Sequence, residues 1–318
     1  MRVSIVIPTW RGGALLRKNL PFLLQSLERS SHSVEVIVVD DGSDDGTPEF
    51  LSREFPRIQV LVHDENRGFS AACLTGAKAA QGEVMILLNN DIIISENLVD
   101  ALMPYFKQED TFSVSPLVVD ESGGMSSVSL RIPFLRRGKL KFEKIKEVPV
   151  SPRYTLFCSG GSVAYSRGKF LELDGFNPLY HPFYLEDQEV GMRAWRRGWK
   201  SYLEPRVRVT HPSGGTIKAH FQKRFVARIR KRNEIIFGLN NMLDTKLLVI
   251  GVLLPLSAKL LYKWLTFRLD YYWGFFSAVR CLPEICQQRE KERHSSVLSE
   301  TEIFNLIARS RPAADSAR

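Results

Sequence analysis

Hydrophobic residues near the start of the chain alternate between short unbroken runs and helical spacing. Residues 3–7 form a β-branched run that is typical of a buried strand, and residues 34–39 form a second run of this kind. Over residues 15–29, between the two runs, leucines recur as they do on the apolar face of a helix. A strand, a helix and a strand at this spacing predict a parallel βαβ unit.

The same alternation continues, and polar residues follow the ends of the strands. Residues 58–63 and 83–88 are strand-like, and residues 70–80 between them are helix-like. The polar residues that follow predicted strands are Thr9, Asp40, Asp41 and Asn89–Asp91. Ligands of parallel α/β sheets bind beyond the carboxyl ends of the strands, so these residues predict a binding site at that edge.

Two adjacent carboxylates lie at the N-terminus of an amphipathic helix predicted within Tyr184–Trp199. Glu186 and Asp187 lie at the positive end of this helix, which stabilises negative charge, and we expect both carboxylates to stay ionised. A positioned, ionised carboxylate is able to accept a proton, so the pair is the candidate reaction centre. A plain helix cap is the alternative, because Asp often precedes an apolar helix.

Several short motifs follow one another in a fixed order along the chain. They are Ile5–Thr9, Val38–Thr47, Asn66–Ala72, Gly82–Asp91, Gly160–Ser166, Leu173–Phe176 and Glu186–Asp187. Together, from Val3 to about Asn241, they resemble the family 2 glycosyltransferases, and within that family the enzymes of bacterial surface polysaccharides, including rhamnosyltransferases. The resemblance implies an α/β GT-A fold with a mostly parallel sheet flanked by helices. It also implies transfer of a sugar from a nucleotide donor with inversion at the anomeric carbon.

The resemblance implies a site for a UDP-, dTDP- or GDP-linked sugar at the strand ends. The implied donor-binding residues are Pro8, Thr9, Asp41, Asn66, Gly68, Asn90 and Asp91. Asp41 is implied as the carboxylate that contacts the nucleotide, although the Asp-Gly-Ser sequence here is also good turn chemistry. The small residues Ser70–Ala72 open a helix whose positive end suits a diphosphate. Cys73 stands where many family members carry an Asn, and this departure leaves that contact open.

A divalent cation is expected beside the donor. Asn89–Asp91 occupies the place of the family's Asp-x-Asp metal motif, and only its last residue is ionised. Mg²⁺ or Mn²⁺ can be held by a single carboxylate together with substrate phosphates and water. The resemblance implies His211 as a second ligand of the metal at Asp91. A structural role is the alternative for a lone histidine after a strand.

The resemblance places the acceptor beside the carboxylate pair. Gly160, Gly161 and Glu189 are implied as acceptor-binding residues, and a plain glycine turn is the alternative for the first two. A single displacement with inversion needs a base that removes the proton of the attacking hydroxyl while the diphosphate leaves. We assign Asp187 as this base and expect Glu186 to orient it or to bind acceptor.

Composition is consistent with a cytoplasmic enzyme of one large or two fused domains. The chain has 318 residues, of which 44% are hydrophobic, enough for a sizeable core. Its 4 cysteines show no metal-binding spacing, and no leader precedes the first strand, so we expect free thiols and a cytoplasmic location. The predicted parts are a donor half at 1–112, an acceptor and catalytic half at 113–241, apolar and aromatic helices at 242–286, and a polar, partly disordered tail at 287–318.

A cluster of basic residues, which contributes to the net charge of +9, precedes an apolar stretch of the chain. The basic residues of this cluster are Lys218, Lys223, Arg224, Arg228, Arg230, Lys231 and Arg232. The uncharged run Leu247–Ala258 follows, and it is shorter than the roughly 20 residues needed to cross a membrane. We therefore predict that the segment from Lys218 to Pro283 lies flat on the cytoplasmic membrane face, where a lipid-linked saccharide is a candidate acceptor. Packing on the catalytic domain or a second subunit is the alternative.

Other functions fit parts of the sequence. A nucleic-acid-binding protein would explain the basic helix, but acidic residues at the strand ends repel phosphates, and we expect no nucleic-acid partner. A nucleotidyltransferase has a similar fold, but the Gly-rich triphosphate loop is missing after the first strand, where Trp10–Gly13 is too short a match. A donor-binding protein without catalysis is a third alternative. No motif identifies the sugar, the nucleobase or the linkage.

Overall fold

The structure is a computed structural model that describes residues 1–126, 129–136, 139–143, 145, 147–211, 221–267 and 270–310. Its centre is an 8-stranded sheet in the order β3-β2-β1-β4-β9-β5-β10-β8. The strands are β1 (Arg2–Thr9), β2 (Ser33–Asp40), β3 (Gln59–Val62), β4 (Val84–Leu88), β5 (Thr111–Val119), β8 (Arg153–Tyr154), β9 (Ser162–Ser166) and β10 (Lys200–Thr210). A separate hairpin consists of β6 (Pro133–Arg136) and β7 (Lys139–Phe142).

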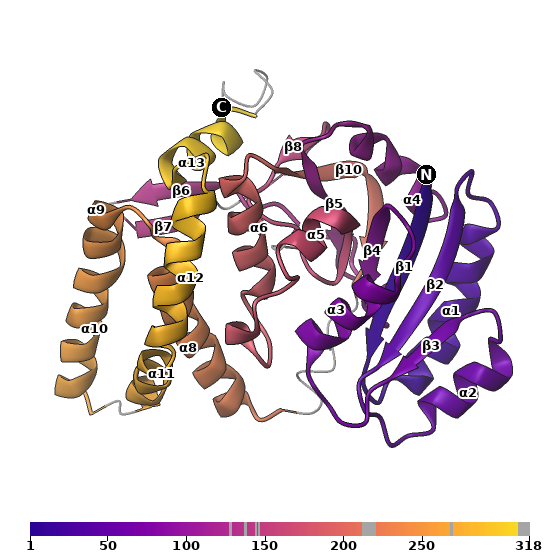
Figure 1. Cartoon of the computed structure of the whole chain (residues 1–318), viewed down its shortest axis with the longest axis horizontal. Helices are drawn as coiled ribbons and strands as arrows, with labels where there is room; N and C mark the ends of the chain where they lie inside the picture. Colours follow the sequence, from indigo (N-terminus) through magenta and orange to yellow (C-terminus); the bar gives the residue numbers. More distant parts are fainter. Residues whose placement is uncertain are drawn as a thin grey trace.

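Helices cover both faces of the sheet, and further helices lie beyond one end of it (Figure 1). The first half contributes α1 (Gly13–Leu27), α2 (Thr47–Glu54), α3 (Phe69–Ala79), α4 (Leu98–Leu102) and η1 (Met103–Lys107). The second half contributes α5 (Arg167–Glu172), η2 (Pro178–Tyr180), α6 (Glu186–Arg196), α8 (Lys223–Asn241), α9 (Thr245–Leu247), η3 (Leu248–Leu253), α10 (Leu254–Leu265), α11 (Asp270–Val279), α12 (Leu282–Ser295) and α13 (Glu300–Arg309).

The predicted βαβ units are confirmed. β1 pairs in parallel with β2 and β4, and β2 pairs in parallel with β3. Side chains of β1 alternate between two cores, as the period of a strand requires. Val3, Ile5 and Ile7 pack with the leucines of α1, whereas Val6 packs with α3 on the opposite face. This two-sided burial explains why the first strand is an unbroken apolar run.

The sheet is mixed rather than wholly parallel. β9 runs antiparallel to both of its neighbours, β4 and β5, and β8 is antiparallel to β10. β10 returns to the parallel direction beside β5. The predicted mostly parallel α/β sheet flanked by helices is therefore confirmed. The expected boundary between residues 112 and 113 falls inside β5, so the two halves share one sheet.

Residues 287–310, predicted as part of a polar, partly disordered tail, contain most of α12 and all of α13. α12 and α13 pack against α6, and Ile303, Phe304 and Ile307 belong to the core that lies beneath it. Part of the polar sequence forms buried ion pairs, because Arg196 lies 3.2 Å from Glu300 and both side chains are almost wholly buried. The final residues, 311–318, for which disorder was predicted, lie outside the described residues.

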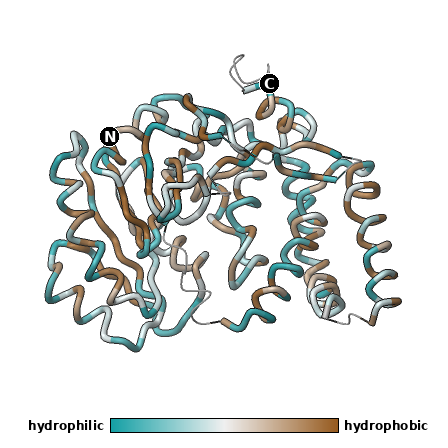
Figure 2. The backbone as a smooth tube through the Cα atoms, turned by 180° about the vertical axis from the view of Figure 1, so that it is seen from behind, coloured by the Kyte–Doolittle hydropathy of each residue, from teal (hydrophilic) through white to brown (hydrophobic). Residues whose placement is uncertain are grey.

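One helix extends further than the sequence pattern indicated. α9, η3 and α10 form a continuous helix of 21 residues over Thr245–Leu265, and an 18-residue window within it has a mean hydropathy of 1.6. Among the described residues, this helix is long and apolar enough to cross a membrane by length and composition, and none of its apolar window is buried. Pro255 does not end it because a π-helical segment precedes the proline, and such a segment loosens the hydrogen-bond ladder. Most residues of β1 and β2 are apolar (Figure 2).

Candidate active site

The predicted donor residues at the ends of β1 and β4 lie together. Oγ1 of Thr9 accepts a 2.8 Å hydrogen bond from Nδ2 of Asn90, and both side chains are buried. Pro8 is buried one residue earlier in β1. The backbone of the turn is held as well, because Nδ2 of Asn19 donates to the carbonyl of Asn90 at 2.7 Å. These contacts fix the turn that presents Asp91.

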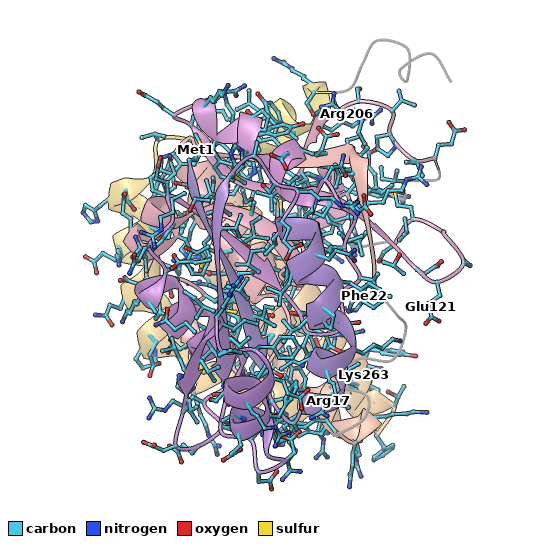
Figure 3. All side chains as sticks on the ribbon, turned by 90° about the vertical axis from the view of Figure 1, so that its right-hand side faces the viewer. Met1, Arg17, Phe22, Glu121, Arg206 and Lys263 are labelled. Atoms are coloured by element: carbon cyan, nitrogen blue, oxygen red, sulfur yellow. The ribbon has the colours of Figure 1, made fainter. Side chains whose placement is uncertain are left out.

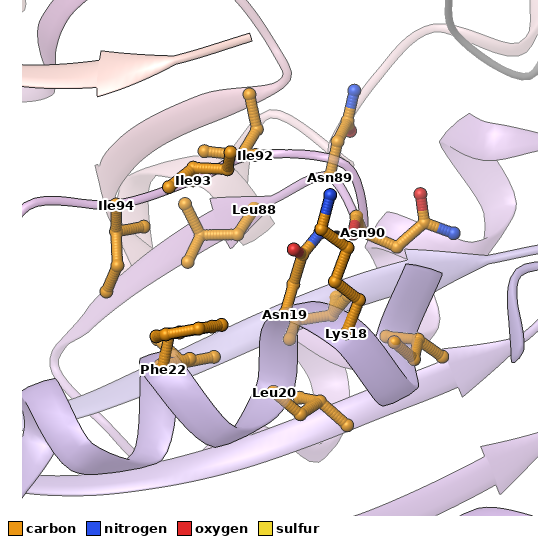
Figure 4. A pocket seen from close by; sticks show the side chains of 13 residues that line it. Lys18, Asn19, Leu20, Phe22, Leu88, Asn89, Asn90, Ile92, Ile93 and Ile94 are labelled. Carbon is orange, nitrogen blue, oxygen red and sulfur yellow. Dashed lines mark hydrogen bonds between the residues drawn. The ribbon is translucent and has the colours of Figure 1, made fainter. Parts of the chain in front are cut away.

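A cavity of about 240 Å³ lies behind this turn, between α1 and residues 88–94 (Figure 4). Its walls are mostly apolar, and Lys18 is the charged residue in its lining. Phe22, which also lines it, is 64% exposed on the outer side of α1 (Figure 3). The cavity brings no acid, base or metal ligand together, so it supports the turn and does not extend the site.

The carboxylate of Asp41 is held by hydrogen bonds within the protein. It accepts hydrogen bonds from the backbone N–H groups of Arg67 at 2.9 Å and Gly68 at 2.7 Å, and it lies 2.7 Å from Nδ1 of His63. The side chain is almost wholly buried. In this structure Asp41 therefore shapes the loop that begins α3, and it reaches the donor region through that loop.

The start of α3 combines predicted and unpredicted residues. Gly68 has φ +87°, and a Cβ there would lie 2.7 Å from Nδ1 of His181, so both the backbone and the neighbouring ring require glycine. Asn66 is exposed beside it. His181, which sequence analysis missed, lies over the helix start where we expected a diphosphate. Cys73 is fully buried, which removes it from direct contact with a ligand.

Asp91 and His211 are brought together as expected for a metal site. Nε2 of His211 lies 3.4 Å from Oδ2 of Asp91. The other carboxylate oxygen, Oδ1, is buried and has no hydrogen-bond partner within the described part of the chain. A buried, unpaired carboxylate oxygen beside an imidazole fits a divalent cation. No cluster of three such ligands occurs among the described residues, so a cation held here would need further ligands from the substrate or water.

The carboxylate pair lies at the start of α6, and an unusual backbone precedes it. Tyr184 and Leu185 have φ +77° and +75°, a conformation that costs free energy for residues other than glycine. Asp187 is held by backbone groups, because its carboxylate accepts a 2.8 Å hydrogen bond from the N–H of Gln188. Gly160 packs against it, since a Cβ at Gly160 would lie 3.9 Å from Cβ of Asp187. Neighbouring Gly161 accepts a hydrogen bond from the N–H of Asn89 at 2.8 Å, which links the two sides of the site.

The charge of the pair differs from the sequence prediction. Desolvation, and then the negative charge of Asp187, raise the pKa of Glu186 to about 8. Desolvation also raises the pKa of Asp187 to about 6, although hydrogen bonds from Gln188 and Gly160 and the nearby Arg131 oppose the shift. The expectation that both carboxylates stay ionised is therefore wrong. Burial and mutual repulsion outweigh the helix dipole and disfavour a double negative charge on the pair.

Glu189 belongs to the interior behind the site. It is fully buried, and its carboxylate lies 2.8 Å from the guanidinium of Arg193 on the next turn of α6. Nδ2 of Asn177 and Nε2 of Gln288 also donate to it, each at 3.3 Å. With its oxygens occupied and no exposed surface, any effect of Glu189 on an acceptor is indirect, through the residues that surround it.

Two further residues act on the pair, and no sequence pattern pointed to them. Nδ2 of Asn233, on α8, lies 2.9 Å from each of the carbonyl oxygens of Tyr180, Phe183 and Tyr184. It therefore holds the strained segment directly before α6. The guanidinium of Arg131 is the cation near Asp187, and its Nε is buried without a hydrogen-bond partner among the described residues. Their sequence neighbourhoods are a basic helix and an irregular loop, which hide both roles.

Comparison with known proteins identifies the family. Residues 4–173, about half of the chain, match glycosyl transferase family 2. The chain belongs to glycosyl transferase family 2. It is therefore a glycosyltransferase, and the resemblance drawn from its motifs is confirmed. The matched region contains the Thr9, Asp41 and Asp91 sites but ends before Glu186 and Asp187.

Relatives of this family 2 protein include enzymes with lipid-linked substrates. It is 26% identical over 236 residues to the N-acetylglucosaminyl-diphospho-decaprenol L-rhamnosyltransferase of Mycobacterium tuberculosis, which covers 66% of this chain and 75% of the relative. It is 27% identical over 172 residues to the dolichol-phosphate mannosyltransferase of Pyrococcus furiosus, covering 49% of this chain and 46% of the relative.

Solved structures confirm the GT-A fold. The mannosyltransferase PcManGT from Pyrobaculum calidifontis, in complex with GDP-Man and Mn²⁺, matches 90% of this chain and 75% of its own with a TM-score of 0.56 and 17% identity. GalNAc-T7 with UDP, GalNAc and Mn²⁺ matches 75% of this chain with the same TM-score of 0.56 and 18% identity. This chain covers 50% of the GalNAc-T7 chain.

Proposed function

We propose that this family 2 glycosyltransferase transfers a sugar from a nucleotide-sugar donor to a hydroxyl of a lipid-linked saccharide, with inversion. The observation that carries the proposal is Asp187, a partly desolvated carboxylate with a pKa of about 6, held by the Gln188 N–H beside the donor-side turn. A base with this pKa is ionised at neutral pH and still basic enough to accept a proton. The rhamnosyltransferase relative, which acts on a diphospholipid-linked sugar, supports this type of acceptor.

The bond changes follow from a single displacement. The acceptor oxygen attacks the anomeric carbon while the bond from that carbon to the diphosphate oxygen breaks. The electron pair leaves with the nucleoside diphosphate, and the hydroxyl proton passes to the carboxylate of Asp187. Burial, and then the charge of Asp187, raise the pKa of Glu186, and in its protonated form Glu186 can donate a hydrogen bond. The attack comes from the side opposite the leaving group, so the anomeric configuration inverts.

The donor half supplies the site for the leaving group. Asp91 and His211 fit a divalent cation, and Mn²⁺ in the structures of two GT-A neighbours supports metal dependence. Such a cation would neutralise the charge that develops on the diphosphate. No side chain caps the N-terminal end of α3, and the positive end of its dipole lies in the same region. Thr9 and Asn90 fix the turn on which Asp91 lies.

The position of the exposed apolar helix supports work at a membrane surface. Thr245–Leu265 lies at the end of the molecule opposite β2 and β3 (Figure 1). The basic helix α8 packs beside it and begins near the sheet edge where β1 and β2 end (Figure 1). We infer that the protein binds the cytoplasmic face of a membrane and functions in cell-surface polysaccharide synthesis. Lys218, part of the predicted basic cluster, lies outside the described residues.

A donor panel tests the function. The protein is incubated with UDP-, GDP- and dTDP-sugars, with Mn²⁺ or EDTA, and with a short-chain diphospholipid-linked saccharide. Formation of a disaccharide-lipid from one donor class, with release of the nucleoside diphosphate, is expected. Release of inorganic pyrophosphate from nucleoside triphosphates would instead establish the nucleotidyltransferase alternative.

A further inference from the structure

A cluster of lysines lines an open cavity beside the start of α6. The cavity has a volume of about 370 Å³ and lies between β7, α8 and the exposed helix Thr245–Leu265. Its amines come from Lys139 and Lys141 on β7, Lys231 on α8 and Lys259 on α10. We call it the lysine pocket. Glu234, the carboxylate in its lining, pairs with Lys231, which leaves the pocket with net positive charge.

The other walls of the lysine pocket are apolar. They include Leu140, Phe142, Ile235, Val252 and Leu256. Burial lowers the pKa of the Lys259 ammonium, Lys231 lowers it further against the opposing effect of Glu234, and Lys139 and Lys141 add to the lowering. Positive charges that disfavour one another around one cavity are stabilised by a bound anion. The pocket therefore suits a multiply charged anion that carries an apolar group.

The pocket reaches both the reaction centre and the exposed apolar surface. Leu185 and Gln188, which flank the carboxylate pair, are part of its lining. The guanidinium of Arg131, the cation near Asp187, lies 5.6 Å from the ring centre of Phe142, which lines the pocket. On the other side, Val252 and Lys259 line the pocket from the helix whose outward residues Leu254 and Leu261 are 59% and 61% exposed.

We propose that the lysine pocket binds the diphosphate of the lipid-linked acceptor. This inference rests on the proposed function and specifies its acceptor as a saccharide joined through a diphosphate to a long apolar alcohol. The lysines pair with the diphosphate, the apolar walls and the outward face of Thr245–Leu265 take the first part of the hydrocarbon chain, and the saccharide extends past Leu185 to Asp187. Lysine amines are common phosphate ligands, and a surface apolar helix lies readily at a membrane interface.

Binding of farnesyl diphosphate to the full-length protein tests this inference. We expect Lys259→Gln and Lys141→Gln each to weaken binding by about tenfold, the size typical of losing one charge-assisted contact. The matched control is Lys263→Gln, which removes the same charge one turn further along α10 but outside the pocket lining. This control should bind within twofold of wild type, because its side chain does not line the pocket.

Parallel probes distinguish the possible sources of affinity. The pocket variants and Lys263→Gln should bind farnesol, which lacks the diphosphate, equally well. They should also bind phosphatidylglycerol vesicles equally well. Equal binding of farnesyl diphosphate by wild type and both pocket variants, or an equal loss in Lys263→Gln, would overturn the inference. Nucleoside diphosphate affinity, measured by calorimetry on the same samples, should be unchanged in every variant. A wild-type protein that binds no nucleotide contradicts the proposed function instead, whatever the result with farnesyl diphosphate.

Discussion

His211 lies 3.4 Å from Asp91. The two residues follow β10 and β4, and these strands are separated in the sheet by β5 and β9. A short bridge joins the two strand ends, because Ile93 and Thr210 exchange backbone hydrogen bonds of 2.9 and 2.8 Å. The bridge carries the end of β10 across the edge of the sheet to the turn after β4. The imidazole and the carboxylate therefore meet by backbone pairing between distant segments, independently of any substrate.

The Asp91–His211 pair predicts metal-dependent donor binding. Asp91→Ala should weaken nucleoside diphosphate binding in Mn²⁺ by at least about tenfold and abolish the response to the metal, since it removes the one carboxylate of the site. His211→Ala should reduce the response only in part. Calorimetry with Mn²⁺ and with EDTA measures both. Glu109→Ala, an exposed carboxylate just before β5, serves as the control, and equal wild-type affinity with Mn²⁺ and EDTA would refute the metal site.

The pKa of Asp187 predicts the acid side of the pH–rate profile. Its carboxylate must be ionised to accept a proton, so kcat/KM should rise with pH through an apparent pKa of about 6. Arg131 lowers this pKa, and Arg131→Gln should therefore move the rise to higher pH. A profile for Arg131→Gln that coincides with that of wild type would show that the guanidinium does not act on the base.

Most of the fold follows from local sequence pattern. The apolar run of β1, the leucine spacing of α1 and the polar strand ends each depend on nearby residues, and all three are found where the pattern placed them. The polar helices α12 and α13 were not predicted as packed elements. Their polar sequence includes partners for Arg196 and Arg197, and such pairing depends on contacts across the fold.

The candidate site could be predicted in its residue types but not in its electrostatics. Glu186 and Asp187 were found from helix-start chemistry, which favours ionised carboxylates. Their raised pKa values come from desolvation and mutual repulsion, and no single segment encodes these. The hydroxyl of Tyr165 lies in the same desolvated, negatively charged environment. Burial, and then nearby charges that include Asp187, raise its pKa. Asn233 was missed for a similar reason, since its partners lie about 50 residues earlier in the chain.

Asn233 predicts a positioning effect that is separate from donor binding. Asn233→Ala removes the donors for the carbonyls before α6, and each buried carbonyl left unpaired costs about 1–3 kcal/mol. The variant should unfold at lower temperature and show a reduced kcat with unchanged nucleoside diphosphate affinity. Thermal unfolding, single-turnover rates and calorimetry report these quantities. Loss of stability with a wild-type kcat would make Asn233 a purely structural residue.

The exposed face of Thr245–Leu265 predicts membrane binding. Leu261 and Leu265 are 61% and 68% exposed, and Leu261→Gln with Leu265→Gln should reduce binding to anionic liposomes by about tenfold or more because apolar burial is lost. Point variants are required here, since truncation before Leu247 would also remove α12 and α13 from the core. Leu306→Gln, an exposed leucine on α13, is the control. A double variant that co-sediments with liposomes as wild type does would leave this helix without a membrane role.

The role of Asp187 as the base is tested most directly by the single-turnover transfer rate of Asp187→Asn. The amide keeps the shape of the side chain but cannot take the proton, so the rate should fall by about 10²–10⁴ while donor affinity stays close to wild type. Asp174→Asn makes the same change at an exposed carboxylate before α6 and should leave the rate unchanged. A transfer rate for Asp187→Asn within a few-fold of wild type would contradict the assignment of Asp187 as the base.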